Sequence, residues 1–413
     1  MQRPTKTDAD DDRGRSRGAT RRTKLVAGLA APLLFGLVST STVGVAEAAA
    51  PSRATPTAPR GRVDLATPKF SNPTAITNPL FPISRLDQAV QLGHEGDEVL
   101  RHEITLLPGT QPIRWNGKDV ETLVSQFVAY GDGRILEVAV DYFAQADDGS
   151  VWYFGEDVAN YVDGVVDNHD GTWRAGRDGP PGMIMPAHPR VGDVYRPENI
   201  PGVVFEEVTV KAVDQTVDGP RGRVRGAIRV RERPMDGVLE DKVFAPGYGE
   251  FEAHVPVDDE LVTVAVAYPT DRLGGSTPRS LRRLTAGAGD AFDEVADEEW
   301  SEVADTVDRM DAAWEAYQAR NVPDLLEAQM DDAFDSLVAA VEAEDAGDAQ
   351  QAAVEVELAG LDLQSQYRTP PAVDDDRVDA WERQLSIDED AGDEAGIASD
   401  EVIIGAIEDR SGD

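Results

Sequence analysis

The chain has 413 residues, a net charge of −39 at pH 7 and no cysteine. Its length suffices for two or three domains, and the lack of cysteine excludes disulfides, thiolate catalysis, cysteine-bound zinc and iron–sulfur clusters. The acidity argues against nucleic acid and anionic membranes as partners, but it permits divalent cations and basic partners. The charge is uneven: residues from Thr285 onward hold 38 Asp and Glu against 6 Lys and Arg, whereas residues 51–284 hold 35 against 25.

The first 50 residues have the order of a secretory signal. Basic residues at 13–24 precede the apolar run LVAGLAAPLLFGLV, and the small residues AEAAA follow it, with cleavage plausible after Ala48 or Ala50. The alternative is an uncleaved anchor, although the run is short for a membrane span. We therefore expect a secreted or cell-envelope protein, which meets a membrane only if this segment is retained. Residues 51–72 are expected to form a Pro-rich spacer.

Residues 73–272 are expected to form an antiparallel β domain. Apolar and polar residues alternate with period two in several short runs, and Gly-Asp turn signals lie between them. The runs are ILEVAVDYF (135–143), VVFEEVTVKAV (203–213), RVRGAIRVRERP (223–234) and LVTVAVAYP (261–269). Because no helical period separates these runs, the pattern predicts one antiparallel sheet, curved or closed as a half-barrel.

The period changes in the C-terminal third. Residues 273–289 read as a linker, and residues 290–413 as an acidic bundle of helices whose apolar residues recur every three or four positions. Trp300 to Tyr317 mark one such face, and the residues after Pro323, which suits a helix start, mark the next. Further helices are expected around Val354–Leu361, around Val378–Leu385 with DDD (374–376) as its N-terminal cap, and around Ile403–Ile407. The fold class is therefore α+β.

Three segments of the β region resemble a family of exported, mainly actinobacterial proteins of unknown function. They are YFAQADDGSVWYFGED (142–157), DGTWRAGRDGPPGMIMPAHPRVGDVYRPE (170–198) and DKVFAPGYGEFE (241–252). The last segment is similar to a turn of periplasmic half-barrels, among them lipoprotein-carrier-like and lipocalin-like folds. The resemblance implies a half-barrel over roughly 75–270 and carries no reaction with it.

The segment 142–157 predicts a hairpin with two unlike faces. A two-residue turn at Asp148-Gly149 would place Asp141 opposite Glu156, and like charges opposed across strands need an arginine, a bound cation or a raised pKa. A register that differs by one or two residues, or contact with solvent, would also relieve the repulsion between the two acids. One face is expected to be core, and it holds Leu136, Val138, Val140, Tyr142, Val151 and Tyr153. The other is expected to line a ligand cleft, and it holds Asp141, Phe143, Gln145, Trp152, Phe154 and Glu156.

The candidate binding residues come from that second face and from one irregular loop. Met183 and Met185, in GRDGPPGMIMPAHPRVG (176–192), either contact an apolar ligand or plug one end of the sheet. The candidate ligand-binding residues are therefore Phe143, Gln145, Trp152, Phe154, Met183 and Met185. Asp141 and Glu156 are the candidate metal ligands, with Ca²⁺ as the possible ion, and no catalytic residue is singled out.

Several classes of activity have no support in the sequence. No HExxH, GxSxG, Walker A or strand-following GxGxxG motif occurs, and no haem, flavin or nucleotide is expected. We expect a non-enzymatic envelope protein that binds a small apolar or amphipathic ligand or an envelope protein. The alternatives are a divalent-cation-binding secreted protein and a hydrolase that uses Asp, Glu or His from separate strands.

Overall fold

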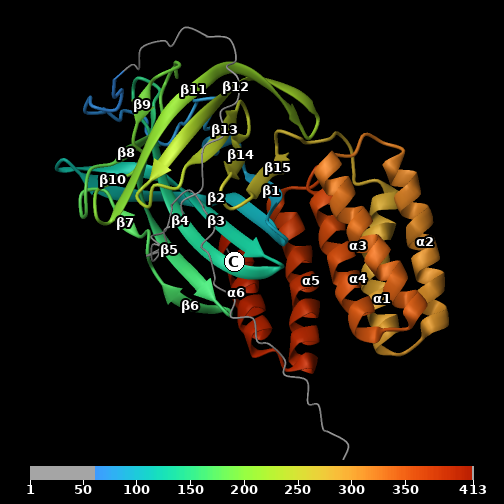
Figure 1. Cartoon of the computed structure of the whole chain (residues 1–413). Coiled ribbons are helices and arrows are strands. Elements are labelled where there is room, and N and C mark those ends of the chain that lie inside the picture. Colours follow the sequence, from blue (N-terminus) through green and yellow to red (C-terminus); the bar gives the residue numbers. More distant parts are fainter. Residues whose placement is uncertain (1–60, 412–413) are drawn as a thin grey trace, which may run out of the picture.

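The computed structural model describes residues 61–411, in which a curved sheet is followed by six helices (Figure 1). The predicted α+β fold with an antiparallel curved sheet and a C-terminal helical bundle is confirmed. The expected signal segment and the first part of the spacer lie outside the described residues. Within residues 61–411, no helix combines the length and the apolar character that a membrane crossing requires.

The strands of the sheet pair antiparallel with one another. In the first half they are β1 (Gln88–Glu95), β2 (Glu98–Trp115), β3 (Lys118–Gly131), β4 (Arg134–Gln145), β5 (Val151–Val162), β6 (Val165–Asn168), β7 (Trp173–Arg174) and β8 (Gly182–Met185). In the second half they are β9 (Val194–Tyr195), β10 (Asn199–Ile200), β11 (Val204–Gly219), β12 (Gly222–Pro234), β13 (Glu240–Ala245), β14 (Gly249–Val255) and β15 (Glu260–Tyr268). A short 3-10 helix, η1 (Ile83–Arg85), precedes β1.

The strand order is β10-β11-β12-β13-β14-β15-β1-β2-β3-β4-β5-β6, so the pairing of β1 with β15 joins the two halves. The segment 173–200 reaches both halves: β7 and β8 pair with β5, and β9 pairs with β11. This segment therefore spans the open side of the curved sheet.

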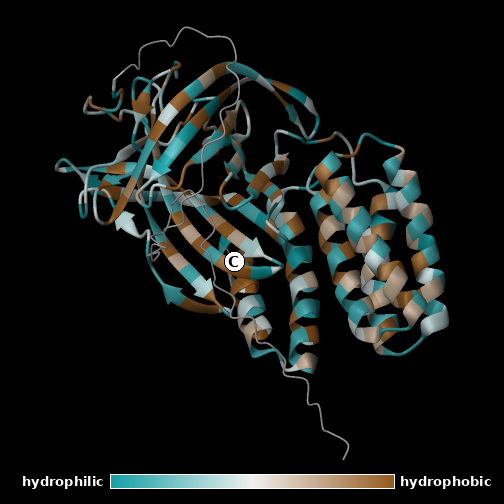
Figure 2. Cartoon of the chain, in the orientation of Figure 1, coloured by the Kyte–Doolittle hydropathy of each residue, from teal (hydrophilic) through white to brown (hydrophobic). Residues whose placement is uncertain are grey.

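Apolar and polar residues alternate along the long strands (Figure 2). Because successive side chains of a strand point to opposite faces, each strand has an inward and an outward set. On β3 and β4, Phe127 and Ala139 belong to the core inside the curve. Their neighbours Val128 and Val138 point outward and pack against α5 (Pro370–Ala391) and α6 (Glu394–Ser411). Residues of β1 and β15, such as Val90 and Val266, pack in the same way against the four helices that residues 279–364 form. The bundle thus covers part of the outer face of the sheet.

The helices are α1 (Arg279–Ala296), α2 (Trp300–Gln318), α3 (Asp324–Ala343), α4 (Ala346–Gln364), α5 (Pro370–Ala391) and α6 (Glu394–Ser411). The expected linker 273–289 is wrong from Arg279 onward, because α1 begins there and buries Leu281 and Leu284 in the bundle. DDD (374–376) does not cap a helix start either. Two prolines open α5 directly after Thr369, since proline fits the first turn, and the three aspartates lie inside the helix.

The described part of the expected spacer is packed on the sheet. Arg62 forms a β-bridge with Val194, and the ring of Phe70 lies edge-on to the rings of Trp115 and Phe154. Residues 61–72 therefore belong to the β domain. An aromatic residue at position 70 supplies the apolar contact that a solvated spacer would lack.

A buried ion network joins the bundle to the outer face of the sheet, and we call it the interface ion network. Arg101 of β2 donates to both oxygens of Asp362 in α4, at 2.5 and 2.8 Å. Arg377 lies 2.8 Å from Asp362 and 2.8 Å from Asp374. Arg410 contacts Asp374 and Glu103. Three arginines and three carboxylates thus balance: Arg101, Arg377, Arg410, Glu103, Asp362 and Asp374.

Candidate functional site

The β4–β5 hairpin places Asp141 directly opposite Glu156, as the sequence predicted. The turn differs from the expected two-residue turn, because Gln145 pairs with Val151 and residues 146–150 form the connection. Both acids are fully buried on the inner side of the sheet. No arginine faces them among the partners that set their pKa values, so the opposition is relieved in another way.

A bulge at Gly155 changes the register of the rest of the hairpin. Phe143 pairs with Tyr153 instead of the expected Phe154. The φ angle of Gly155 is 119°, and a Cβ atom there would lie 2.2 Å from the carbonyl oxygen of Trp173. Only glycine tolerates both the angle and the close approach. The extra residue moves Tyr153 onto the same face as Phe143.

The expected aromatic wall is therefore wrong in composition. Phe143 stacks on Tyr153 at a centroid distance of 4.9 Å. Trp152 pairs with an alanine on the opposite face, and Phe154 contacts Phe70 at 5.3 Å. Phe143, Trp152 and Phe154 are buried in the core on both sides of the hairpin, so they do not form one ligand-facing surface.

The other three candidate ligand-binding residues hold segments of the chain together. The side-chain oxygen of Gln145 accepts hydrogen bonds from the backbone N–H groups of Thr77 and Asn78, which fixes the segment before β1. Met183 and Met185 are buried on β8, which pairs with β5. Both methionines belong to the core inside the sheet.

Asp141, Glu156 and Glu198 meet inside the curve, and we call them the Asp141 cluster. Glu198 comes from the segment that spans the open side of the sheet. The Tyr153 hydroxyl donates to Asp141 Oδ1 at 2.5 Å, and Trp173 Nε1 donates to Glu198 Oε1 at 3.0 Å. Neither oxygen of Glu156 receives a hydrogen bond from an amide, hydroxyl or basic group of residues 61–411. Its partner is the Glu198 carboxyl group.

Raised pKa values relieve the repulsion in the Asp141 cluster. Burial raises the pKa of Asp141 to about 7. Burial also raises the pKa of Glu198 to about 7, although hydrogen bonds from Glu156 and Trp173 oppose that rise. Burial, reinforced by the neighbouring Glu198 and Asp141 carboxylates, holds the pKa of Glu156 well above its usual range. Glu156 therefore keeps its proton near neutral pH and shares it with Glu198.

A second inward group surrounds the buried amine of Lys242, and we call it the Lys242 cluster. Lys242 Nζ lies 3.0 Å from Glu232 Oε2, 3.3 Å from Glu250 Oε2 and 3.5 Å from Glu240 Oε2. Burial opposes the charge of Lys242, but these three carboxyl groups outweigh it and hold its pKa well above the usual value. Glu206 lies beside Glu232, and burial together with that neighbour raises the pKa of Glu206.

The two clusters belong to one set of buried acids inside the sheet, which we call the carboxyl network. Burial raises the pKa of Glu137 to about 8, with Asp141 contributing, and raises the pKa of Glu260 to about 7. The nine members are Glu137, Asp141, Glu156, Glu198, Glu206, Glu232, Glu240, Glu250 and Glu260. Lys242 is the one buried lysine beside them in residues 61–411. Burial and Lys242 lower the pKa of His102 to about 3, so that ring is neutral.

A crevice leads from the surface toward the carboxyl network. Its cavity has a volume of about 20 Å³, enough for one water molecule, and lies between the η1 segment and the β13–β14 turn. Phe81, Phe143 and Ile104 supply apolar walls, and Ser125 and Glu250 supply polar ones. The crevice thus combines apolar walls with one member of the carboxyl network, Glu250.

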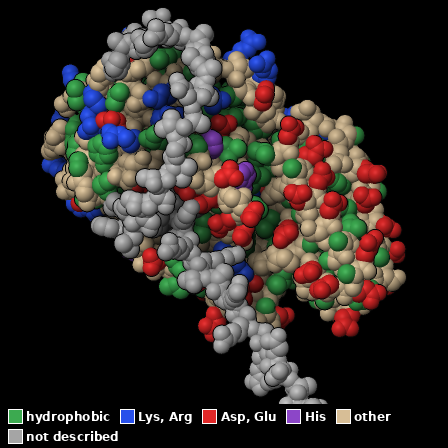
Figure 3. Space-filling view, in the orientation of Figure 1, with side chains coloured by type: hydrophobic (Ala, Val, Ile, Leu, Met, Phe, Trp, Pro, Cys, Tyr) green, Lys and Arg blue, Asp and Glu red, His purple; other side chains and the backbone are tan. Residues whose placement is uncertain are grey.

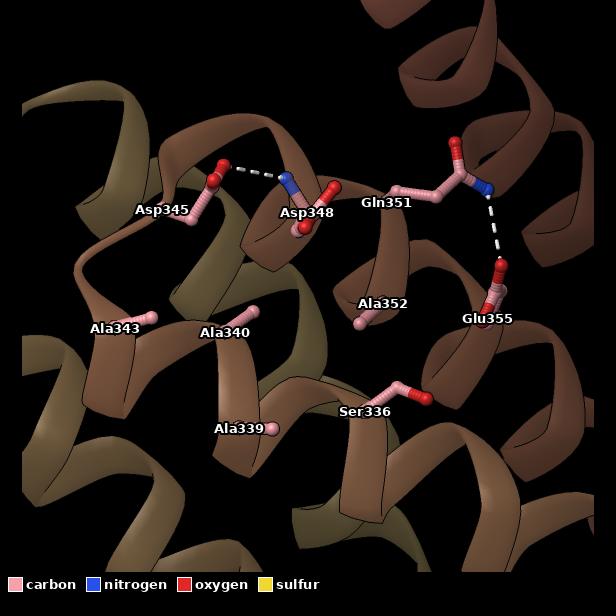
Figure 4. A pocket seen from close by; sticks show the side chains of 9 residues that line it. All are labelled: Ser336, Ala339, Ala340, Ala343, Asp345, Asp348, Gln351, Ala352 and Glu355. Atoms are coloured by element: carbon pink, nitrogen blue, oxygen red, sulfur yellow. Dashed lines mark hydrogen bonds between the residues drawn. The ribbon is translucent and has the colours of Figure 1, made fainter.

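A second hollow lies on the bundle, between α3 and α4 (Figure 4). Its volume is about 410 Å³, and alanines form its floor while Asp345, Asp348 and Glu355 stand at its rim. Asp345 caps α4 by accepting from the Asp348 backbone N–H, and Gln351 donates to Glu355. The side chains of Asp345 and Glu355 thus already have structural partners.

No group of three or more Asp, Glu or His side chains in residues 61–411 is arranged to hold a metal ion. The expected pair Asp141 and Glu156 is brought together, but it shares its surroundings with a third acid and with neutral donors. The carboxyl groups hold protons instead, which is the raised-pKa alternative for this pair.

Sequence reasoning missed the Lys242 cluster, although a signal was present. In VVFEEVTV the inward positions are Val204, Glu206 and Val208, so strict alternation places Glu206 in the core. The same alternation places Glu232 on the inward face of its strand with Val230, and Lys242 on the inward face of its strand with Phe244. Charged residues at inward positions of an alternating strand therefore mark this network. Glu198 could not be found in this way, because it lies in an irregular segment.

No family model, curated protein or solved structure matches the chain. The geometry of the curved sheet and its carboxyl network is therefore the basis for the function proposed below.

Proposed function

We propose that this chain is a non-enzymatic, extracytoplasmic binding protein that holds a small amphipathic ligand inside its curved sheet. Export is supported by the basic, apolar and small-residue order of the first 50 residues. A ligand site inside the sheet is supported by the crevice, whose lining combines aromatic side chains with the carboxyl group of Glu250.

The observation that carries the proposal is the imbalance inside the sheet, where nine acids accompany one lysine. Burying a carboxyl group costs free energy unless it is paired or protonated. Packed apolar residues would stabilise such an interior better, so stability alone does not account for the acids. A ligand with a positively charged or donor-rich head and an apolar body would complement both parts of the interior.

Binding of a neutral fluorescent amphiphile tests the proposal. N-phenyl-1-naphthylamine should gain fluorescence when it enters the crevice, and Phe81→Ala should strengthen binding by removing a ring from the crevice wall. Leu65→Ala is the matched control, because Leu65 is 73% exposed. If neither the wild type nor Phe81→Ala raises the fluorescence, the proposal is wrong. If the fluorescence rises, native mass spectrometry of protein purified from its host identifies the natural ligand.

A further inference from the structure

We infer that the Asp141 cluster is a binding site for a primary ammonium group. The inference rests on the proposed function and names the head group of the ligand. Its starting point is the Lys242 cluster, in which the same sheet interior already holds a primary ammonium among three carboxyl groups, at 3.0–3.5 Å. The Lys242 side chain is only 2% exposed, so the ammonium is held without solvent.

The Asp141 cluster repeats that composition without a resident cation. It too contains three carboxyl groups, and Asp141 and Glu156 are fully buried. Asp141 Oδ2 and both oxygens of Glu156 receive no hydrogen bond from an amide, hydroxyl or basic group of residues 61–411. The donors present are neutral: the Tyr153 hydroxyl and the Trp173 indole N–H. Asp141 Oδ2 thus remains for a ligand, and so do both oxygens of Glu156 once the proton that Glu156 shares with Glu198 has left.

An ammonium group matches this site because it has three N–H donors and a single positive charge. When it binds, the proton shared by Glu156 and Glu198 leaves to solvent, so one positive charge replaces another. The rings of Tyr153 and Trp173 lie edge to face with centroids 5.5 Å apart. A neutral hydroxyl head would not gain the attraction of the carboxylates for a positive charge.

One aromatic layer separates the crevice from this site, since no residue of the Asp141 cluster lines the crevice. Phe143 lines the crevice and stacks on Tyr153, whose hydroxyl group contacts Asp141. The crevice holds about one water molecule, so a ligand enters only when this aromatic layer moves, and an unbranched alkyl chain requires a smaller movement than a bulky body. The inferred ligand class is therefore a primary alkylamine or the primary amine end of a longer chain.

Several titratable groups face Glu156 and determine the proton count. Glu137, Asp141 and Tyr153 belong to β4 and β5, and Glu198 comes from the spanning segment. The positive charge of Lys242, on β13, lowers the pKa of Glu198. Because Glu156 and Glu198 share one proton before binding, about one proton should be released for each ammonium bound near pH 6.5.

Calorimetric titration of the purified protein with three hexyl compounds tests the inference. Hexylamine hydrochloride should bind at least about tenfold more tightly than hexan-1-ol or hexyltrimethylammonium, which lack the charge or the N–H donors. Titrations in two buffers of different ionisation heat should show the release of about one proton. Glu156→Gln should lower hexylamine affinity at least about tenfold and abolish proton release.

Asp157→Asn is the matched control, because Asp157 neighbours Glu156 on β5 but bonds Tyr142 on the other face and is half exposed. It should change hexylamine affinity less than about twofold. Thermal unfolding checks that both variants are folded. If hexan-1-ol binds as tightly as hexylamine, or if Glu156→Gln leaves hexylamine affinity unchanged, the inference is overturned while the binding function stands. If neither the hexyl series nor N-phenyl-1-naphthylamine binds, both are wrong.

Discussion

Two buried regions of this molecule differ in their balance of acidic and basic side chains. The interface ion network has three arginines for three carboxylates, whereas the carboxyl network has nine acids beside one lysine. Burial alone would raise the pKa of Glu103 in the first region, but Arg410, Arg101 and Arg377 outweigh it and hold that pKa well below its usual range. In the second region burial raises the pKa of Glu137 to about 8.

The difference shows that neighbouring positive charge, and not the degree of burial, decides the charge state of a buried acid. Both regions have side chains that are almost fully enclosed. The interface ion network stays ionised and joins the bundle to the sheet, whereas the carboxyl network holds protons near neutral pH. Most of the acidity visible on the surface lies on the bundle, whereas Lys and Arg gather on the sheet (Figure 3). Surface charge therefore gives no indication of what lies inside the sheet.

The largest effect is expected at the interface ion network. Arg377→Ala removes one partner each of Asp362 and Asp374 and the donor to Gln88, and leaves two arginines for the three buried carboxylates. We expect the free energy of unfolding to fall by about 5 kcal/mol. Urea unfolding monitored by circular dichroism measures it. Because Glu103 and Asp362 stay ionised down to acidic pH, the loss should be similar at pH 8 and pH 5.

Arg114→Ala is the matched control for that variant. Arg114 pairs with Asp119, but the two side chains are 69% and 59% exposed. Its loss should be below about 1 kcal/mol, since solvent replaces an exposed partner. Equal losses for Arg114 and Arg377 would contradict the interpretation of the interface ion network.

The next effect is expected at the single cation of the carboxyl network. Lys242→Met leaves Glu232, Glu240 and Glu250 without their ammonium partner. We expect a loss of about 4 kcal/mol at pH 8, because buried carboxylates without a partner are costly. At pH 5 the loss should shrink, since protons can take the place of the lysine. Urea unfolding at both pH values distinguishes this variant from Arg377→Ala, and a loss independent of pH would remove the contrast between the two regions.

Removing one acid from the carboxyl network should stabilise the protein. The pKa of Glu137 is about 8 in the fold against 4.5 for the free side chain, so the fold takes up a proton that the unfolded chain lacks near neutral pH. The contribution of this group to stability is complete below pH 4.5 and is lost as the pH rises to 8. Glu137→Gln should therefore gain about 3 kcal/mol at pH 7 and almost nothing at pH 4. Thermal or urea unfolding of both proteins across this range measures the difference, and destabilisation at pH 7 would contradict it.

The wild type should respond to pH in the same direction. The pKa values of Asp141, Glu198 and Glu260 are raised to about 7, so stability should increase as the pH falls from 8 to 5. Below pH 4 it should decrease, because Glu103 and Asp362, whose pKa values are lowered, begin to take up protons in the unfolded chain. A stability maximum at neutral pH would show that the carboxyl network is ionised.

Periodicity in the sequence was enough to predict the curved sheet, the bundle and the opposition of Asp141 and Glu156. It failed where the chain departs from a regular period. The bulge at Gly155 exchanged the faces of Tyr153 and Phe154, and nothing in the alternation itself marks an inserted residue. The start of α1 at Arg279 was missed because glycines and threonine near it suggested a linker.

The candidate site could be predicted only in part, for a related reason. Alternation places Glu206 and Lys242 inside the sheet, but it gives no distance between strands that are far apart in sequence. Glu198 reaches Glu156 through a segment with little regular structure. A three-carboxyl cluster built from β4, β5 and that segment depends on how the open side of the sheet is spanned, which is a property of the tertiary structure.

The smallest effect is expected at a third kind of ion pair, on the outer face of the sheet. Arg231 of β12 donates to both oxygens of Asp241 at 2.7 Å through Nε and Nη2, and Arg101 likewise makes a two-bond contact with Asp362, through Nη1 and Nη2. The Arg231 and Asp241 side chains are 45% and 37% exposed. Arg231→Gln should therefore cost only about 0.5 kcal/mol, and 0.5 M NaCl should remove most of that difference. Urea unfolding with and without salt measures it. A loss as large as that of Arg377→Ala would mean that pair geometry, and not exclusion from solvent, governs the ion pairs of this fold.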